Sequence, residues 1–285
     1  MKRKPIIAIL YDFDKTLCTT DMQDYAFIPA LGYTPKEFWH IANTFGSENH
    51  MDALLAYMYT MIDECRRKGL RLDRDFLVSC GRAIRLFPGV AGWFSRINAF
   101  GESLHITVEH YVLSSGLKEI IEGSGIAHEF REIYACEFLY GEDGLAMWPK
   151  LDVNFTNKTQ FVYRINKGVL DVANDRDLNA SMPDDSKRIP FTNMIYVGDG
   201  LSDVPCMKMM RAYGGQAVAV YQDSNRPGVE ALLADGRVDF IFPADYNEGS
   251  DLDVTMKAIQ RRMAISETLN EMNQTQLRTV LARSP

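Results

Sequence analysis

Short apolar runs alternate along this 285-residue chain with longer segments in which apolar residues recur at helical spacing. The short runs predict buried strands because they span only a few residues and end at polar or glycine-containing turns. They occupy residues 5–11, 106–113, 194–198, 216–221 and 238–242. The helical segments begin near residues 90, 116, 157, 203 and 251. This alternation is typical of a parallel sheet covered by helices.

Residues 19–87 interrupt the alternation, because they contain helical patterns and no convincing strand. Thr34-Pro35-Lys36-Glu37 is a capping box with proline at the first helical position. Asp73 is a suitable N-cap for a further helix, whose apolar stripe continues to residue 87. We therefore expect a separate helical unit inserted after the first strand.

The remaining residues complete the expected organisation. Residues 133–148 predict a hairpin around a Gly-Glu-Asp-Gly turn, and the polar segment 171–190 predicts a surface excursion. The last helix is expected to end near residue 272, with the final dozen residues loosely held. The expected fold is α/β, a three-layer parallel core with a helical cap. The core is assigned to residues 1–18 and 88–285, and the cap to residues 19–87.

The composition of the chain limits which kinds of binding partner and location we expect. The net charge of −7 argues against nucleic acid or an anionic membrane surface as the main partner. No stretch approaches the roughly 18 apolar residues of a membrane span. The apolar run after Met1–Lys4 stops at Leu10, too short for a signal peptide. The five cysteines are odd in number and contain no C-x-x-C pair, which favours reduced thiols in the cytoplasm.

Two groups of aspartates follow predicted strands. Asp12 and Asp14 come directly after the first strand, and Asp199 and Asp203 come after the strand at 194–198. Carboxyl ends of neighbouring parallel strands form the crevice in which open α/β sheets bind ligands. Carboxylates gathered there would repel one another unless a hard cation lies between them, and Mg²⁺ prefers oxygen ligands. The pattern therefore predicts a magnesium site suited to phosphate chemistry.

Each aspartate has an expected role in that chemistry. Asp12, directly at the strand end, is the candidate nucleophile, which would form an aspartyl phosphate. Asp14 can protonate the leaving alkoxide and then deprotonate the attacking water. Mg²⁺ is expected to contact the Asp12 side chain, the Asp14 backbone carbonyl and the Asp199 side chain. Asp203 is expected to act as a ligand through water or to orient another ligand.

The phosphoryl oxygens need positive charge and hydrogen-bond donors. Ser114 offers a hydroxyl, and the amides of Ser115 and Gly116 are expected at a helix N-terminus, where anions bind readily. Lys158, at the start of a predicted helix, is the expected phosphate-binding lysine. Lys167 is the rival candidate, but its place at the polar end of the same helix favours a solvated role.

These four elements together resemble the haloacid dehalogenase superfamily of aspartate-nucleophile phosphohydrolases. The matching elements are the D-x-D-x-T run at 12–16, Ser114, Lys158 and the G-D-G-x-x-D run at 198–203. The resemblance implies a Rossmann-like core and dependence on Mg²⁺. The helical unit is similar in position to the C1 cap of phosphoserine phosphatase and its relatives.

The resemblance also directs attention to Asp21, nine residues beyond the candidate nucleophile. Phosphoserine phosphatases carry an acidic residue there that contacts the substrate amine, although Asp21 could instead cap a helix beginning at Met22. The expected activity is Mg²⁺-dependent hydrolysis of a small-molecule phosphomonoester through an aspartyl phosphate. A phosphomutase or phosphotransferase of the same superfamily, and a phosphoryl-accepting regulatory module, remain alternatives.

Overall fold

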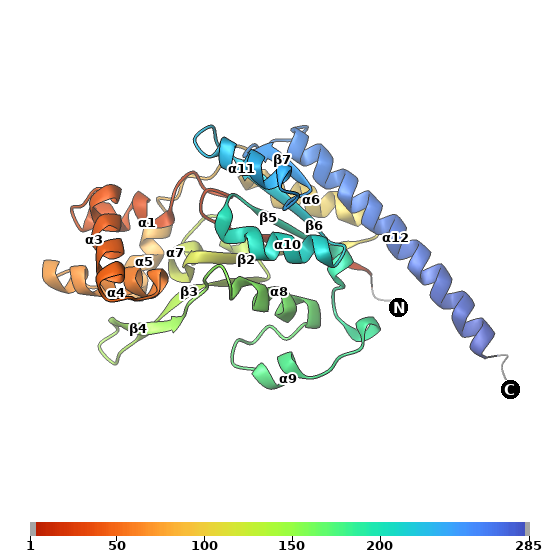
Figure 1. The fold of residues 1–285 in the computed structure, drawn as a ribbon, viewed down its shortest axis with the longest axis horizontal. Coiled ribbons are helices and arrows are strands. Elements are labelled where there is room, and N and C mark those ends of the chain that lie inside the picture. The colour runs from red at the N-terminus through yellow and green to blue at the C-terminus, as the bar shows by residue number, and fades with distance from the viewer. Residues whose placement is uncertain (1–3, 283–285) are drawn as a thin grey trace.

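A seven-stranded sheet forms the centre of the computed structural model, which describes residues 4–282 (Figure 1). The strand order is β4-β3-β2-β1-β5-β6-β7, and every neighbouring pair is parallel except β3 and β4. The strands are β1 (Ile6–Tyr11), β2 (Thr107–Leu117), β3 (Glu132–Tyr140), β4 (Ala146–Leu151), β5 (Met194–Gly198), β6 (Gln216–Tyr221) and β7 (Phe240–Pro243). The expected α/β class with a mostly parallel sheet is confirmed. The first three residues of the basic start lie outside the described part of the chain.

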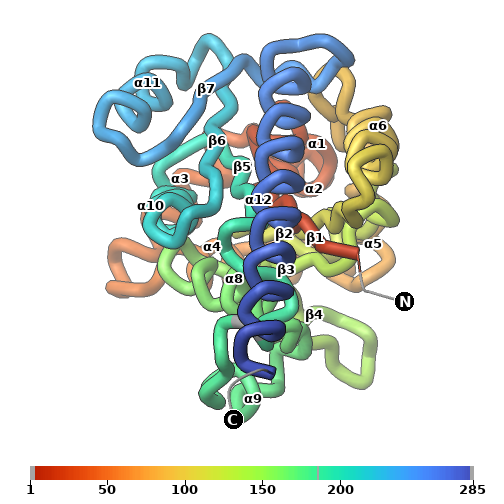
Figure 2. The backbone as a smooth tube through the Cα atoms, turned by 90° about the vertical axis from the view of Figure 1, so that its right-hand side faces the viewer, coloured from red at the N-terminus to blue at the C-terminus, as the bar shows by residue number. Residues whose placement is uncertain are grey.

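Helices cover both faces of the sheet (Figure 2). Strand β1 is buried along its whole length, and its alternate residues belong to two different apolar clusters. One cluster includes helices α6 (Val90–Ser103) and α12 (Asp251–Leu281), whereas the other includes α8 (Lys158–Lys167), α10 (Val204–Ala212) and α11 (Arg226–Ala234). Burial on both sides explains why the short run of the sequence that forms β1 is apolar throughout and does not alternate with polar residues.

The named elements of the inserted segment are all helices, and the segment lies at one end of the sheet (Figure 1). These helices are α1 (Met22–Tyr25), α2 (Phe27–Ala30), α3 (Pro35–Glu48), α4 (Ala53–Lys68) and α5 (Arg74–Gly81). We call residues 19–87 the helical unit. The predicted capping box is present at Thr34 and Glu37, and the Asp73 side chain accepts a hydrogen bond from the Phe76 amide.

Helix α5 ends at Gly81, although the apolar periodicity predicted helix as far as residue 87. The chain must return to the sheet here, and it does so beside the segment that left it. The Thr19 amide donates to the Arg85 carbonyl, and the Phe87 amide donates to the Leu17 carbonyl, each over 3.0 Å. These pairings require an extended backbone and therefore override the helical pattern.

Other segments differ less from expectation. The hairpin is formed by β3 and β4, and the polar excursion contains α9 (Asp175–Asn179). Helix α12 continues to Leu281, with every side chain from Thr268 to Ala282 exposed. The remaining short helices are α7 (Lys118–Glu122) and four 3₁₀ turns at Ala127–Glu129, Asp184–Ser186, Phe191–Asn193 and Leu201–Asp203. In the described part of the chain, no helix has both the length and the apolar character needed to cross a membrane.

Two glycines bring the helical unit into backbone contact with the core. A Cβ atom on Gly123, which follows α7, would lie 1.8 Å from the Val78 carbonyl oxygen of α5. A Cβ atom on Gly81 would lie 2.1 Å from the Ile120 carbonyl oxygen. Both neighbours are backbone atoms, so a side chain at either position would push the helical unit away from the core.

We expect Gly123→Ala to lower the free energy of unfolding by about 1–3 kcal/mol, because helix α5 must shift to admit the methyl group. Gly125→Ala is the matched control, since a Cβ atom there meets no atom within 4 Å. Denaturant unfolding of both variants measures the difference. Equal stability of the two variants would contradict the close contact.

Candidate active site

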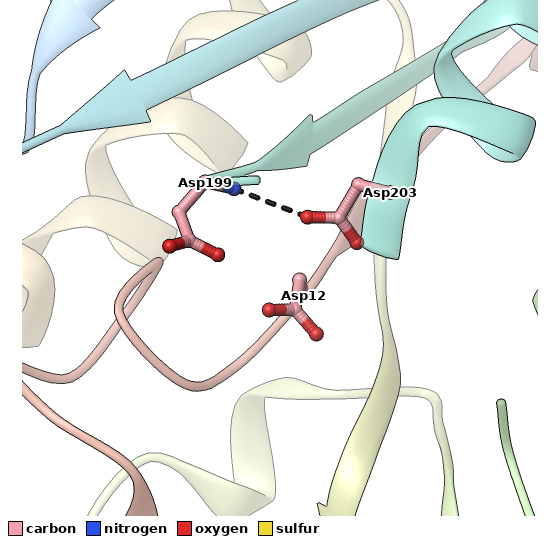
Figure 3. A group of neighbouring side chains, drawn as sticks. All are labelled: Asp12, Asp199 and Asp203. Atoms are coloured by element: carbon pink, nitrogen blue, oxygen red, sulfur yellow. Dashed lines mark hydrogen bonds between the residues drawn. The ribbon is translucent and has the colours of Figure 1, made fainter. Parts of the chain in front are cut away.

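The ends of β1 and β5 bring three aspartates together, as Figure 3 shows. The two strands pair in parallel, and the Asp12 amide continues the ladder by donating to the Val197 carbonyl over 2.9 Å. One carboxylate oxygen from each of Asp12, Asp199 and Asp203 lies within 4.8 Å of the others. Asp12 is 5% exposed and Asp203 is fully buried. The expected convergence of the two aspartate runs is therefore present in the structure.

Lys158 is the cation of this cluster. It is fully buried at the start of α8, and its Nζ atom lies 2.9 Å from Asp12 Oδ1 and 2.8 Å from Asp203 Oδ1. Lys167, at the other end of the helix, donates to the carbonyls of Leu178 and Ala180. Of the two candidate lysines, the fold places Lys158 at the aspartates and Lys167 away from them.

Asp203 has hydrogen-bond partners on both carboxylate oxygens. Besides Lys158, Oδ1 accepts from the Tyr196 hydroxyl over 2.7 Å. Oδ2 accepts from the amides of Asp199 and Gly200 over 3.1 and 3.4 Å. Asp203 therefore forms hydrogen bonds both with the loop that carries Asp199 and with the buried Lys158.

Asp14 extends from the same loop toward the helical unit. Its Oδ1 atom accepts from the Met22 amide over 2.9 Å, at the start of α1. Its Oδ2 atom would lie 3.0 Å from a Cβ atom on Gly116, at the end of β2. Burial, followed by the negative charges of Asp21 and Asp12, raises the pKa of Asp14 well above its ordinary value. A carboxyl group in this position is suited to carry a proton.

The expected helix N-terminus at Ser115 and Gly116 is wrong. Strand β2 continues to Leu117, which pairs with Cys136 of β3, and the five-residue α7 begins only at Lys118. The Gly116 amide donates to Ser114 Oγ over 3.0 Å, while the Ser115 side chain donates to the Val153 carbonyl. The pairing with β3 is irregular between Leu113 and Leu117, but the strand resumes at Leu117, so these amides lie within β2 and not at a helix terminus. Ser114 is buried, with 1% of its surface exposed.

Asp21 occupies the N-cap position of α1, but its side chain makes no capping hydrogen bond. Both of its carboxylate oxygens instead accept from Lys15 Nζ, each over 2.8 Å. Lys15 has a positive φ of 57°, which is uncommon for a residue other than glycine. The ion pair connects the aspartate loop with the first residues of the helical unit.

The structure adds three polar side chains that the sequence analysis did not single out. Tyr196 binds Asp203, Tyr246 donates to the Thr16 carbonyl over 2.7 Å, and Asn225 lies 3.3 Å from Asp199. Tyr196 lies within an apolar strand, and the other two are far from any aspartate run. Asn225 and Tyr246 have partners in distant parts of the chain, and the apolar pattern around Tyr196 does not show that its hydroxyl reaches Asp203 seven residues later.

The charges of the cluster fit a divalent cation. Three carboxylates and the single ammonium of Lys158 leave a formal charge of −3 + 1 = −2. Burial raises the pKa of Asp12 to about 6, against the lowering effect of Lys158. Burial, Asp12 and Asp203 raise the pKa of Asp199 to about 8. A donor set made only of oxygens suits Mg²⁺, which would favour the ionised carboxylates.

We expect the metal-free protein to lose stability as the pH rises from 5.5 to 8.5. Folded Asp12 and Asp199 retain protons that the unfolded chain releases near pH 4, so the unfolded state binds fewer protons across this range. The melting temperature in EDTA should fall by about 5 °C or more, and Mg²⁺ should reduce the fall. Thermal unfolding with EDTA and with MgCl₂ tests this. A melting temperature in EDTA that rises with pH would contradict it.

Comparisons with known proteins agree with this geometry. A family model described as haloacid dehalogenase-like hydrolase matches residues 9–208. An uncharacterized protein of Borreliella burgdorferi is 27% identical over 286 residues, covering 88% of this chain and 95% of the relative.

Solved structures share the fold at low sequence identity. An apo phosphoserine phosphatase has a TM-score of 0.55 at 15% identity, covering 87% of this chain and 97% of its own. A HAD family hydrolase of Salmonella enterica serovar Typhi has a TM-score of 0.53 at 18% identity, covering 81% of this chain and 71% of its own. A probable phosphoserine phosphatase from Vibrio cholerae has a TM-score of 0.56 at 14% identity, covering 93% of this chain and 67% of its own. Since the family model covers more than half of the chain and contains both aspartate runs, the chain belongs to the haloacid dehalogenase-like hydrolases.

Proposed function

We propose that this protein is a Mg²⁺-dependent phosphatase that hydrolyses a small-molecule phosphomonoester through an aspartyl phosphate. The observation that carries the proposal is the cluster at the end of β1. Asp12 is held by the buried Lys158 and lies beside Asp199, and a second carboxyl group, that of Asp14, follows two residues later. The likeness to phosphoserine phosphatase structures supports the same reaction class.

In the first step, the Asp12 carboxylate attacks phosphorus and the bond from phosphorus to the leaving oxygen breaks. Lys158 favours the ionised form of Asp12 and partly offsets the effect of burial on its pKa. The negative charges of Asp12 and Asp203 in turn raise the pKa of Lys158 against the effect of its own burial. The ammonium group can also neutralise the transferred phosphoryl oxygens. Ser114 is proposed to supply a hydroxyl to them, and the amides of Ser115 and Gly116 are proposed as further donors despite their extended backbone.

Asp14 is proposed as the general acid and base. Its raised pKa favours the protonated form that can give a proton to the leaving alkoxide. In the second step, Asp14 takes a proton from the water that attacks the aspartyl phosphate. The bond between phosphorus and Asp12 then breaks, releasing inorganic phosphate and restoring the carboxylate.

The metal site is proposed to comprise the side chains of Asp12 and Asp199 and the backbone carbonyl of Asp14. Asp203 would act through water or by orienting the other groups, since both of its oxygens already have protein partners. Bound Mg²⁺ would neutralise the phosphate and align it with the nucleophile.

The helical unit is proposed as the cap, with residues 1–18 and 88–285 as the core. Two of its residues reach the reacting groups: the Met22 amide binds Asp14, and the Tyr57 hydroxyl donates to the Ser115 carbonyl over 3.0 Å. A cap that contacts these groups would exclude water and bulky substrates. We propose Asp21 as a contact for a substrate amine, which would have to displace Lys15. The buried free cysteines support a location in the cytoplasm.

Phosphate release from a panel of small phosphomonoesters, with Mg²⁺ or with EDTA, tests the proposal. Phosphoserine, phosphoethanolamine, glycerol phosphate and nucleoside monophosphates cover amine and neutral leaving groups. Metal-dependent turnover of at least one compound is expected. Lack of turnover together with a stable phosphoenzyme after treatment with acetyl phosphate would instead favour a regulatory module.

A further inference from the structure

A loop outside the segment matched by the family model reaches the aspartate cluster. This loop, residues 222–225, connects β6 to α11. Asn225 occupies the N-cap position of α11, but its side chain makes no capping hydrogen bond to that helix. Its Nδ2 atom instead lies 3.3 Å from both the backbone oxygen and the Oδ2 atom of Asp199. A residue type that usually caps helices is therefore directed at a carboxylate of the cluster.

The orientation of the Asn225 side-chain amide is set by a hydrogen bond to its oxygen atom. Asn225 Oδ1 accepts from the Gln222 backbone amide over 2.8 Å. Because an N–H group can face only the oxygen of the side-chain amide, this hydrogen bond turns Nδ2 toward Asp199. Asp199 thus receives a donor whose direction is fixed by the fold of the loop.

The same loop also binds the linker that leads into the helical unit. Gln222 Nε2 donates to the Thr19 carbonyl over 3.1 Å. Thr19 in turn pairs through its amide with Arg85, in the returning linker. A continuous series of hydrogen bonds therefore runs from the linkers of the helical unit through Gln222 and Asn225 to Asp199.

We propose that Gln222 and Asn225 are positioning residues that couple the linkers of the helical unit to Asp199 and so set the affinity for Mg²⁺. The inference rests on the metal site of the proposed function. The amide of Asn225 contacts Oδ2 of the Asp199 carboxylate and so limits rotation of a group that lies in the cluster with Asp12 and Asp203. Groups that orient a metal ligand in this way commonly change metal affinity by about 10–100-fold when removed.

Asn225→Ser separates this role from a structural one. Serine is as well suited as asparagine to the N-cap position, so the start of α11 should not be weakened, but the short serine side chain does not reach Asp199. Calorimetric titration of the full-length protein with MgCl₂, without substrate, should show about 10-fold weaker binding. Ser224→Ala, an exposed position in the same loop, should bind Mg²⁺ as the wild type does. Unchanged affinity in Asn225→Ser would overturn the proposal.

Gln222→Met tests the connection to the linker, because it removes the donor to Thr19 and keeps the side-chain length. We expect weaker Mg²⁺ binding here as well, and a double variant that binds no more weakly than Asn225→Ser alone. Strictly additive effects would show that the two residues act separately and would overturn the coupling. Wild-type protein that binds no Mg²⁺ would overturn the metal site and the inference together. Metal binding without phosphatase activity would overturn only the proposed function.

Discussion

Asp12→Asn should abolish phosphate release, with kcat reduced by about 10⁵-fold or more. Asparagine has nearly the same shape as aspartate, but its neutral amide is a poor nucleophile and cannot form the acyl phosphate. The amide oxygen can still accept from Lys158, so the fold should remain. The measurement is single-substrate kinetics with the best compound of the panel, together with thermal unfolding of the variant.

Asp75→Asn is the matched control, because Asp75 is exposed in the first turn of α5 and lies outside the aspartate cluster. Its kcat should equal that of the wild type. Asp12→Asn protein that is folded and retains more than about one hundredth of the wild-type kcat would exclude Asp12 as the nucleophile.

Lys158→Met should damage both stability and activity. Lys158 is the shared partner of Asp12 and Asp203, and its removal leaves two buried carboxylates without their cation. Breaking a buried ion pair by removing one partner costs about 3–5 kcal/mol. Loss of the charged group that we propose neutralises the phosphoryl oxygens should also lower kcat by about 10²–10³-fold. Denaturant unfolding and phosphate release measure the two effects.

Lys167→Met is the informative comparison for this variant. Lys167 lies on the same helix, but its hydrogen-bond partners within the described residues are two backbone carbonyls of the polar excursion. Its replacement should leave kcat unchanged and cost about 1 kcal/mol of stability or less. Equal losses of activity in the two variants would show that the effect comes from α8 as a whole and not from the ammonium at the aspartates.

Much of the core could be predicted because its patterns are local. Strands β5 and β6 begin and end where their apolar runs do, apart from one residue of β5 that already belongs to the aspartate turn. The capping box at Thr34 was also correct, since capping depends on residues within one turn of helix. Helix α11 was missed, although its apolar residues Val229 and Leu232 follow the helical spacing after Pro227.

The errors lie where distant segments compete with a local preference. Ser114–Gly116 resemble the start of a helix, but pairing with β3 keeps the backbone extended as far as Leu117. Residues 82–87 continue a helical pattern, but hydrogen bonds to residues 17–19 require them to leave the helix. Intrinsic helix propensity contributes only about a few tenths of a kcal/mol per residue. In both cases, contacts between segments far apart in the sequence outweigh it.

The sequence by itself determined the class of fold, the family resemblance, and the meeting of Asp12 with Asp199 at one sheet edge. The fold class and the meeting of the aspartates follow from periodicity and from the rule that parallel strands end on the same side of a sheet, whereas the resemblance follows from the two aspartate runs together with Ser114 and Lys158. Only the tertiary structure showed that Lys158 and not Lys167 lies at the aspartates, gave Asp21 its partner Lys15, and brought Asn225 to Asp199. Those contacts depend on the lengths and directions of elements packed against each other, which a one-dimensional pattern does not contain.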